Sequence, residues 1–237
     1  MKAVILAAGL GSRLAPITNE VPKCMVEVNG IKIVEQQINN LIKAGICPED
    51  IVVLTGYKAE ILESFLQNKF PGVNWIRNDL YNKTNNMYSM YMTKPFVVGQ
   101  NFLLMNGDVF FAPEIIAKLL ADPREDLIVC DDGIYIEESM KIRKAGERIV
   151  EISKKISPQD AYGVSIDVYK FSAEASAMFF ETMRQYIEVR QDLNSWTEVA
   201  LNTLLQTKEF QSLDMKDPWV EIDNHDDLKE AESKFKA

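Results

Sequence analysis

Two glycines and two cations near the N-terminus form the stretch of this sequence with the clearest chemical potential. They follow residues 3–7, a short apolar run of the kind that forms a buried strand in a parallel sheet. Gly9 and Gly11 allow backbone N–H groups to approach an anion without a Cβ in the way. Arg13 and Lys23 then supply positive charge. Together these residues predict a loop that holds a triphosphate.

This loop matches neither of two common phosphate-binding motifs. No Gly-Lys-Ser/Thr follows the glycines, which excludes a P-loop, and Leu14 stands where the dinucleotide fingerprint needs its third glycine. A Gly-x-Gly after a strand is weak evidence by itself. The alternative is an ordinary strand–loop–helix connection in which Arg13 and Lys23 are merely solvated.

A polar, amide-rich segment at residues 78–92 is the second candidate. It begins with Asn78 at the end of a predicted strand, and we expect a helix to open near Asn86. Asn85 and Asn86 either cap this helix or place amides where a base or a ribose can be hydrogen-bonded. Tyr88 belongs either to the helix core or to a pocket wall.

Two aspartates also follow predicted strands. Asp108 comes after the apolar run at residues 102–105, and Asp223 comes after the run at residues 219–222. Ligands of open α/β sheets bind at the carboxyl ends of strands, so both aspartates have a position suited to a ligand. Each could instead only cap a following helix, which is the commoner role of a lone aspartate there.

The elements that must position these residues alternate between strand and helix in the first part of the chain. Apolar runs predict strands at residues 3–7, 26–28, 31–33, 51–54, 73–76, 102–105, 127–130, 141–143, 149–152, 162–171 and 219–222. Helical periodicity predicts helices at residues 35–44, 59–70, 114–120, 173–189, 197–206 and from 226 onward. Such alternation implies parallel pairing with right-handed crossovers. We expect an α/β fold with a mostly parallel mixed sheet and helices on both faces, in a single domain over residues 1–237.

Composition restricts the partners of this chain. Of its 237 residues 47% are hydrophobic and 26% charged, with a formal net charge of −9. An acidic protein is a poor match to nucleic acid or an anionic membrane. The N-terminal apolar run ends in Gly-x-Gly and is typical of a first strand rather than a signal peptide, and no run has the length of a membrane span. The three cysteines lack metal-site spacing, so we expect buried, reduced thiols in a cytoplasmic protein. The sequence gives no indication of oligomeric state.

Two strings carry a resemblance to a known family. Residues 6–14 (LAAGLGSRL), followed by Pro16, Thr18, Pro22 and Lys23, resemble the signature of the nucleotidyltransferases that make activated sugars and activated small phosphates. The string NNMYS at residues 85–89 resembles the small-phosphate cytidylyltransferases, such as the phosphocholine enzymes. The resemblance implies a Rossmann-like fold of the nucleotide-diphospho-sugar transferase type. It also implies Mg²⁺-dependent transfer of CMP from CTP to a small phosphate or phosphonate, with release of pyrophosphate.

The resemblance further assigns roles to individual positions. The expected nucleotide-binding residues are Leu6, Ala7, Ala8, Gly9, Gly11, Ser12, Arg13, Lys23, Asn78, Asn85, Asn86 and Gly107. Asp108 and Asp223 would bind Mg²⁺. Arg13, Lys23 and Lys154 would act in catalysis, with Lys154 on the acceptor phosphate and Lys155 as the rival for that role. The expected acceptor-binding residues are Tyr88, Asp131, Asp132, Lys154, Trp196, Glu198 and Trp219.

Aromatic rings and acids in the expected acceptor set suit a cationic head group, which favours an acceptor that bears an amine or a quaternary ammonium. One alternative is a nucleotidyltransferase for a sugar 1-phosphate or an inositol phosphate. A second is a regulatory protein that binds a nucleotide without turnover. The sequence offers no Ser, Cys or His catalytic triad, and nucleotidyl transfer needs none.

Overall fold

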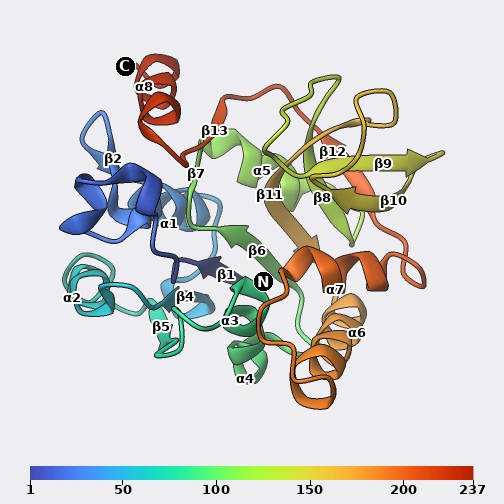
Figure 1. Cartoon of the computed structure of the whole chain (residues 1–237), viewed down its shortest axis with the longest axis horizontal. Coiled ribbons are helices and arrows are strands. Elements are labelled where there is room, and N and C mark those ends of the chain that lie inside the picture. Colours follow the sequence, from blue (N-terminus) through green and yellow to red (C-terminus); the bar gives the residue numbers. More distant parts are fainter. Residues whose placement is uncertain (237) are drawn as a thin grey trace.

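Nine strands form one mixed sheet in the order β5-β4-β1-β6-β11-β8-β12-β10-β9, with helices on both faces (Figure 1). The computed structural model describes residues 1–236. Four neighbouring strands are parallel to one another: β1 (Lys2–Leu6), β4 (Ile51–Thr55), β5 (Asn74–Arg77) and β6 (Phe102–Asn106). Helices α1 (Ile33–Lys43) and α2 (Ala59–Lys69) connect strands within this part. The predicted alternation of strand and helix is confirmed here.

Antiparallel pairing enters the sheet at β11 (Gly163–Phe171), which runs opposite to both β6 and β8 (Leu127–Asp132). Strand β12 (Gln211–Asp214) is parallel to β8, and the hairpin of β9 (Lys141–Ala145) and β10 (Arg148–Ser153) forms the far edge. The predicted mixed sheet is confirmed, but its parallel part is smaller than expected. The sequence pattern misses β12 because this short strand contains only one apolar side chain, that of Leu213.

Each face of the sheet carries its own set of helices. Helices α1, α2 and α5 (Pro113–Ala121) cover one face, and α3 (Asn86–Met92), α6 (Ala173–Arg184) and α7 (Thr197–Leu204) cover the other. Successive side chains of a strand point to opposite faces. Accordingly, Ala3 and Ile5 of β1 join the first core, whereas Val4 and Leu6 join the second. Both faces of β1 are therefore buried, which explains its unbroken apolar sequence.

A second, two-stranded sheet connects the middle of the chain to its C-terminal part. Strand β7 (Val109–Phe111) pairs antiparallel with β13 (Trp219–Glu221), and Val109 lies opposite Glu221. Helix α8 (His225–Lys234) follows β13 and is capped by Asn224 rather than by Asp223. The sequence pattern does not predict β7, because this strand has only three residues and only Gly107 and Asp108 separate it from the end of β6. Residues 27–28 (β2) and 31–32 (β3) form the small hairpin near the N-terminus.

Two further expectations need adjustment. The helix predicted at residues 173–189 is regular only to Arg184, and Gln185–Val189 continue it as a π-helical turn. Cys24 and Cys130 are buried as expected, but Cys47 is exposed. Cys47 precedes the short 3₁₀ turn Pro48–Asp50 at the surface, so the prediction that it is buried is wrong.

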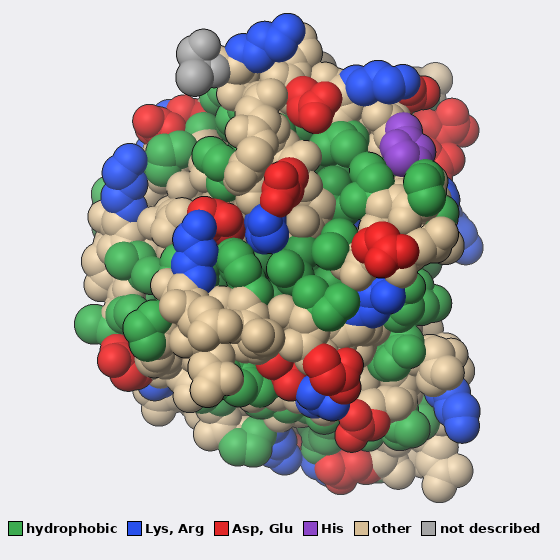
Figure 2. All heavy atoms as spheres, turned by 90° about the vertical axis from the view of Figure 1, so that its left-hand side faces the viewer, with side chains coloured by type: hydrophobic (Ala, Val, Ile, Leu, Met, Phe, Trp, Pro, Cys, Tyr) green, Lys and Arg blue, Asp and Glu red, His purple; other side chains and the backbone are tan. Residues whose placement is uncertain are grey.

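The surface shows no segregation of charge on the face drawn in Figure 2, where acidic and basic side chains are interspersed. Over residues 1–236, the structure contains no helix long and apolar enough to cross a membrane.

Candidate active site

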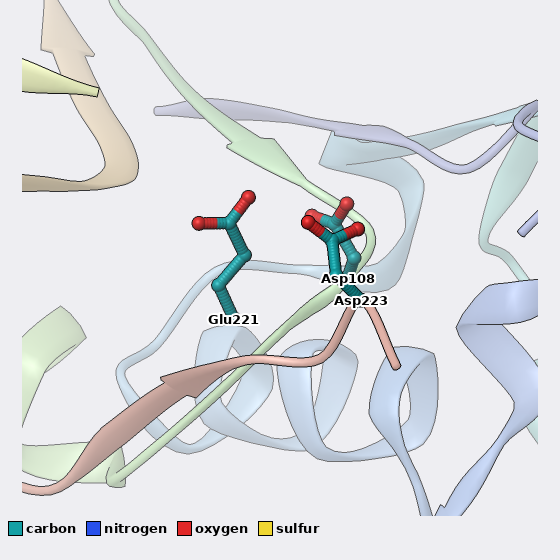
Figure 3. Close-up of side chains that lie close together, drawn as sticks. All are labelled: Asp108, Glu221 and Asp223. Carbon is teal, nitrogen blue, oxygen red and sulfur yellow. The ribbon is translucent and has the colours of Figure 1, made fainter. Parts of the chain in front are cut away.

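Three carboxylates lie close together where β7 of the small sheet follows the carboxyl end of β6 in the large sheet. Asp108 lies between β6 and β7, Glu221 ends β13, and Asp223 follows two residues later; one oxygen of each lies within 4.8 Å of the others (Figure 3). The pairing of β7 with β13 brings them together, and the Ile222 N–H donates a hydrogen bond of 2.9 Å to the Asp108 carbonyl oxygen. The structure thus unites Asp108 and Asp223, as the sequence predicts.

Lys23 and Arg13 from the glycine loop contact this cluster directly. The Lys23 Nζ donates to Asp108 Oδ2 at 2.7 Å and to Asp223 Oδ1 at 2.6 Å, and the Arg13 guanidinium lies 2.8 Å from Asp223 Oδ2. Burial disfavours the charge on Lys23, but the two carboxylates outweigh it and hold the pKa of its ammonium above the ordinary value. For Asp223 the same cations outweigh burial and lower the pKa.

Glu221 is a member of the cluster that the sequence analysis misses. Burial, with Asp108 and Asp223 nearby, raises the pKa of its carboxyl to about 7. Ser139 donates a hydrogen bond of 2.9 Å to Glu221 Oε2. A signal was present in the sequence: Glu221 and Asp223 are two residues apart at the end of a strand, so their side chains share a side.

Glycines permit the close packing that brings this loop to the sheet. Gly11 has a φ of +63°, and a Cβ added there would lie 2.8 Å from the Lys23 Cβ. A Cβ at Gly107 would lie 2.8 Å from the carbonyl oxygen of Leu6. By contrast, a Cβ at Gly9 would meet nothing within 4 Å, so the space in front of Gly9 is open.

Two adjoining cavities flank the carboxylate cluster. The first, the glycine-loop cavity, has a volume of about 190 Å³ and is lined by Leu6, Ala7, Ala8, Gly9, Lys23, Cys24, Tyr81, Thr84, Asn85, Asn86, Ser89, Asn106, Gly107 and Asp108. The second, the carboxylate cavity, has a similar volume and is lined by Arg13, Asn85, Asn86, Asn106, Asp108, Met140, Lys154, Asp167, Trp196, Glu198, Glu221 and Asp223. They share Asn85, Asn86, Asn106 and Asp108, so two molecules could meet at Asp108.

The amides predicted to bind a nucleotide have differing surroundings. Asn85 Oδ1 accepts a hydrogen bond of 2.8 Å from the Asn86 N–H and caps α3. Asn86 Oδ1 accepts one of 2.9 Å from the Thr197 N–H at the start of α7. Asn78 is buried, and its amide donates to Thr84 and Ser89 at 3.0 Å each. The structure brings Asn85 and Asn86 to both cavities but leaves Asn78 away from them.

The predicted acceptor residues are divided between two places. Lys154, Trp196 and Glu198 line the carboxylate cavity, whereas the neighbouring Lys155 is exposed outside it. The Lys154 Nζ lies 5.7 Å from the centre of the Trp196 ring. Within residues 1–236, Lys154 forms no ion pair.

Asp131 and Trp219 line a third, C-terminal cavity of about 450 Å³, on the other side of Glu221. There the Trp219 Nε1 donates to Asp131 Oδ2 at 2.9 Å, and Lys216 forms ion pairs with Asp131 and Asp132. Asp132 is outside all three cavities, as are Gly11 and Ser12 in the loop and Tyr88, which packs against the second core. The predicted acceptor set therefore does not form one group.

Asp167 is a second residue that the sequence analysis misses. It lies within the buried strand β11, lines the carboxylate cavity, and has a side chain held by Asn106 and Tyr169. Burial and the nearby carboxylates of Glu221 and Glu198 raise the pKa of Asp167 well above its ordinary value. A lone acid in an apolar strand sequence is the signal that could have identified it.

The carboxylate cluster has the chemistry of a divalent-cation site. Carboxylate oxygens are the ligands that Mg²⁺ and similar hard cations prefer. Asp108 Oδ1 is buried and has no hydrogen-bond partner among the described residues, so it is free to bind a cation. Lys23 currently neutralises the other oxygen of Asp108.

Fold and site together define an enzyme of the nucleotidyltransferase class. The sequence model of the Nucleotidyl transferase family matches residues 2–237, and the chain belongs to this family. The resemblance of the glycine-loop string to this family is thereby confirmed.

Within this family, the chain is similar in sequence to several cytidylyltransferases. The chain is 28% identical to CTP:phosphoglutamine cytidylyltransferase of Campylobacter jejuni, over 96% of this chain and 98% of that protein. It is 46% identical to choline-phosphate cytidylyltransferase of Streptococcus pneumoniae, over 77% of this chain and 82% of that protein. A solved structure of CTP:phosphocholine cytidylyltransferase from Streptococcus pneumoniae superposes with a TM-score of 0.82 over 99% of both chains at 23% identity, which supports the fold.

Proposed function

We propose that this protein transfers CMP from CTP to a small phosphate or phosphonate that bears an amine, and releases pyrophosphate. One observation carries the proposal. Lys23 and Arg13, which leave the glycine loop, meet Asp108 and Asp223 at the boundary between two adjoining cavities. Such an arrangement suits a reaction in which a triphosphate and a second anion approach each other at one charged centre.

Mg²⁺ is the cofactor that we propose for this site, held by Asp108 and Asp223 with Glu221 as a further ligand. When bound, it would neutralise charge on the phosphate oxygens and orient the reacting groups. Lys23 already neutralises the two aspartates in the structure, so the cluster is assembled before any cation binds.

The residues of the glycine loop would hold the triphosphate. Gly9 lines the first cavity and has open space beside its Cα, so its backbone could approach a phosphate closely. Lys23 and Arg13 would stabilise the charge that develops on the α-phosphate and on the departing pyrophosphate. Asn85 and Asn86 line the same cavity and carry amide groups suited to base or ribose.

The acceptor would lie in the carboxylate cavity with its phosphate near Lys154. One of its phosphate oxygens attacks the α-phosphorus of CTP, the bond between that phosphorus and the oxygen bridging to the β-phosphate breaks, and pyrophosphate leaves with the electron pair. The protein supplies no nucleophile. Its contribution is to align two anions that repel each other in water.

A panel of nucleotides and acceptors tests the proposal. Pyrophosphate release would be measured with CTP, UTP, GTP and ATP against phosphoethanolamine, phosphocholine, 2-aminoethylphosphonate, inositol 1-phosphate and glucose 1-phosphate, with Mg²⁺ or with EDTA. We expect turnover with CTP and an amine-bearing acceptor, and none in EDTA. Release with UTP and glucose 1-phosphate instead would identify a sugar nucleotidyltransferase. Calorimetric binding of CTP without pyrophosphate from any pair would indicate a regulatory protein.

A further inference from the structure

Asp167 occupies an unusual place in the sheet. It has a φ of +57° in the middle of β11, and the register between β11 and β8 shifts between Ser165 and Tyr169. A positive φ is uncommon for a residue other than glycine. A shift of this kind re-aims a side chain relative to regular strand geometry. Here the carboxylate of Asp167 lines the carboxylate cavity, although the residue is only 6% exposed.

The hydroxyl of Tyr169 lies between the carboxyl groups of Asp167 and Glu198. This hydroxyl donates a hydrogen bond of 2.8 Å to Asp167 Oδ1 and lies 3.5 Å from Glu198 Oε1. The Asn106 Nδ2 donates to Asp167 Oδ2 at 2.9 Å. Asp167 and Glu198 form no ion pair with any lysine or arginine in residues 1–236. Ionising two buried carboxyl groups that form no ion pair is costly, so their cavity favours a positively charged ligand.

The same cavity also carries a lysine that forms no direct ion pair. Lys154 lines it together with the two acids and has no ion-pair partner within the described chain. The cavity therefore presents a cation and a pair of carboxyl groups to one ligand, and a cationic ligand would stabilise the ionised form of these carboxyl groups. A molecule with a phosphate at one end and an ammonium at the other complements both.

We propose that the acceptor carries a primary ammonium, which Asp167 and Glu198 bind, and that a quaternary ammonium is a poor substrate. This inference rests on the proposed function. A primary ammonium donates three hydrogen bonds, which suits carboxylate oxygens, whereas a trimethylammonium group donates none. Aromatic faces are the usual partners of quaternary ammonium groups. Trp196 is the one aromatic residue among those that line the cavity, and it already lies near the Lys154 ammonium.

A methylation series on the wild-type protein tests this inference directly. Phosphoethanolamine, its N-methyl and N,N-dimethyl derivatives, and phosphocholine would be compared as acceptors with CTP and Mg²⁺. We expect kcat/KM to fall with each methyl group, by about 10²-fold or more in total, since the site loses hydrogen bonds to buried carboxylates. Calorimetry without Mg²⁺ should show the same order of affinity. Phosphocholine turned over as well as phosphoethanolamine would overturn the inference while leaving cytidylyl transfer intact. If only sugar phosphates react, the proposed function itself is wrong.

The variant Asp167→Asn identifies the residue that discriminates. It should raise the KM for phosphoethanolamine about tenfold or more, leave the KM for CTP unchanged, and reduce the preference for the primary amine. Asp214→Asn is a matched control, because Asp214 also accepts a hydrogen bond from a tyrosine hydroxyl, that of Tyr162, at 2.6 Å but lies outside the cavities. An unchanged preference in Asp167→Asn would contradict the assignment. If this variant fails to fold, the methylation series still decides.

Discussion

The two sides of the candidate site treat their charges in opposite ways. On the side of the glycine loop, Lys23 and Arg13 are paired with Asp108 and Asp223 at 2.6–2.8 Å. On the side of β11 and α7, Lys154, Asp167 and Glu198 line one cavity without an ion pair in residues 1–236. The first side, called the paired side below, is therefore assembled with its own counter-ions, whereas the acidic and basic groups of the second, the unpaired side, form no ion pairs with one another. We infer that the first serves the chemistry shared by the family and the second selects the acceptor.

The largest effect should come from Asp108→Asn on the paired side. The change removes a proposed metal ligand whose second oxygen is buried and free of hydrogen bonds. A metal supplies several kcal/mol of charge stabilisation, so turnover should fall by about 10³-fold. Pyrophosphate release over a range of Mg²⁺ concentrations measures this. Asp217→Asn is the control, since Asp217 pairs with Lys118 away from the cavities. Unaltered Mg²⁺ dependence in Asp108→Asn would show that other groups hold the ion.

Lys23→Ala should also reduce kcat strongly, by about 10²–10³-fold, because it removes the donor that we propose stabilises the charge on the reacting phosphates. A merely solvated Lys23 would have little role in stability, but its side chain is only 13% exposed and forms two ion pairs. In EDTA the variant should therefore have a lower Tm than wild type, since two carboxylates lose their counter-ion.

Mg²⁺ should restore part of that stability in Lys23→Ala. Lys118→Ala removes a surface ion pair and should change Tm little. A Lys23→Ala protein with wild-type kcat would exclude the catalytic role, and an unchanged Tm in EDTA would exclude the structural one.

Lys154→Ala tests the unpaired side. We expect the KM for the acceptor to rise about tenfold or more while the KM for CTP and the Tm stay near wild type, because no ion pair is broken. The neighbouring Lys155→Ala is the matched control, since Lys155 is exposed outside the cavity. Equal effects from both lysines would mean that position in the cavity is unimportant.

The smallest effect concerns pH and Asp167. The raised pKa means that the folded protein binds a proton at Asp167 above the ordinary aspartate range, where the unfolded chain does not. Stability from this group is present at low pH and is lost as pH rises. The nearby carboxyl groups of Glu221, Glu198 and Asp108 also raise the pKa of Asp167.

Urea unfolding in EDTA at pH 5 and pH 8 measures this dependence. The loss of stability between these values should be smaller in Asp167→Asn than in wild type. An equal loss would assign the dependence to the other carboxylates alone.

The paired side is the easier one to predict from the sequence, because its evidence is local. Glycines, cations and an apolar strand lie within one short segment, and their geometry follows from chain connectivity. The strands and helices of that half were likewise predicted from periodicity. The role of Lys23 stays a prediction, and its contact with Asp108 depends on tertiary structure that spacing does not specify.

The unpaired side is harder to predict, because its residues lie far apart in the sequence and only tertiary structure brings them together. Asp167 lines its cavity because β11 shifts register, and no residue pattern specifies that shift. Residue type alone groups Asp131 and Trp219 with Glu198, yet the structure places them in another cavity, which shares Glu221 with the carboxylate cavity. Composition suggests which residue types are available, but only the fold decides which of them face one ligand.

The pairing of β7 with β13 has a consequence for the folding of the nascent chain during synthesis. A nascent chain that has emerged only as far as residue 214 already contains the glycine loop, Lys23 and Asp108. It lacks Glu221 and Asp223, which are two of the three carboxylates at the centre. The carboxylate cluster is therefore completed only when β13, which is synthesised late, docks on β7, which is synthesised much earlier, so any activity that needs this cluster arises late in biosynthesis.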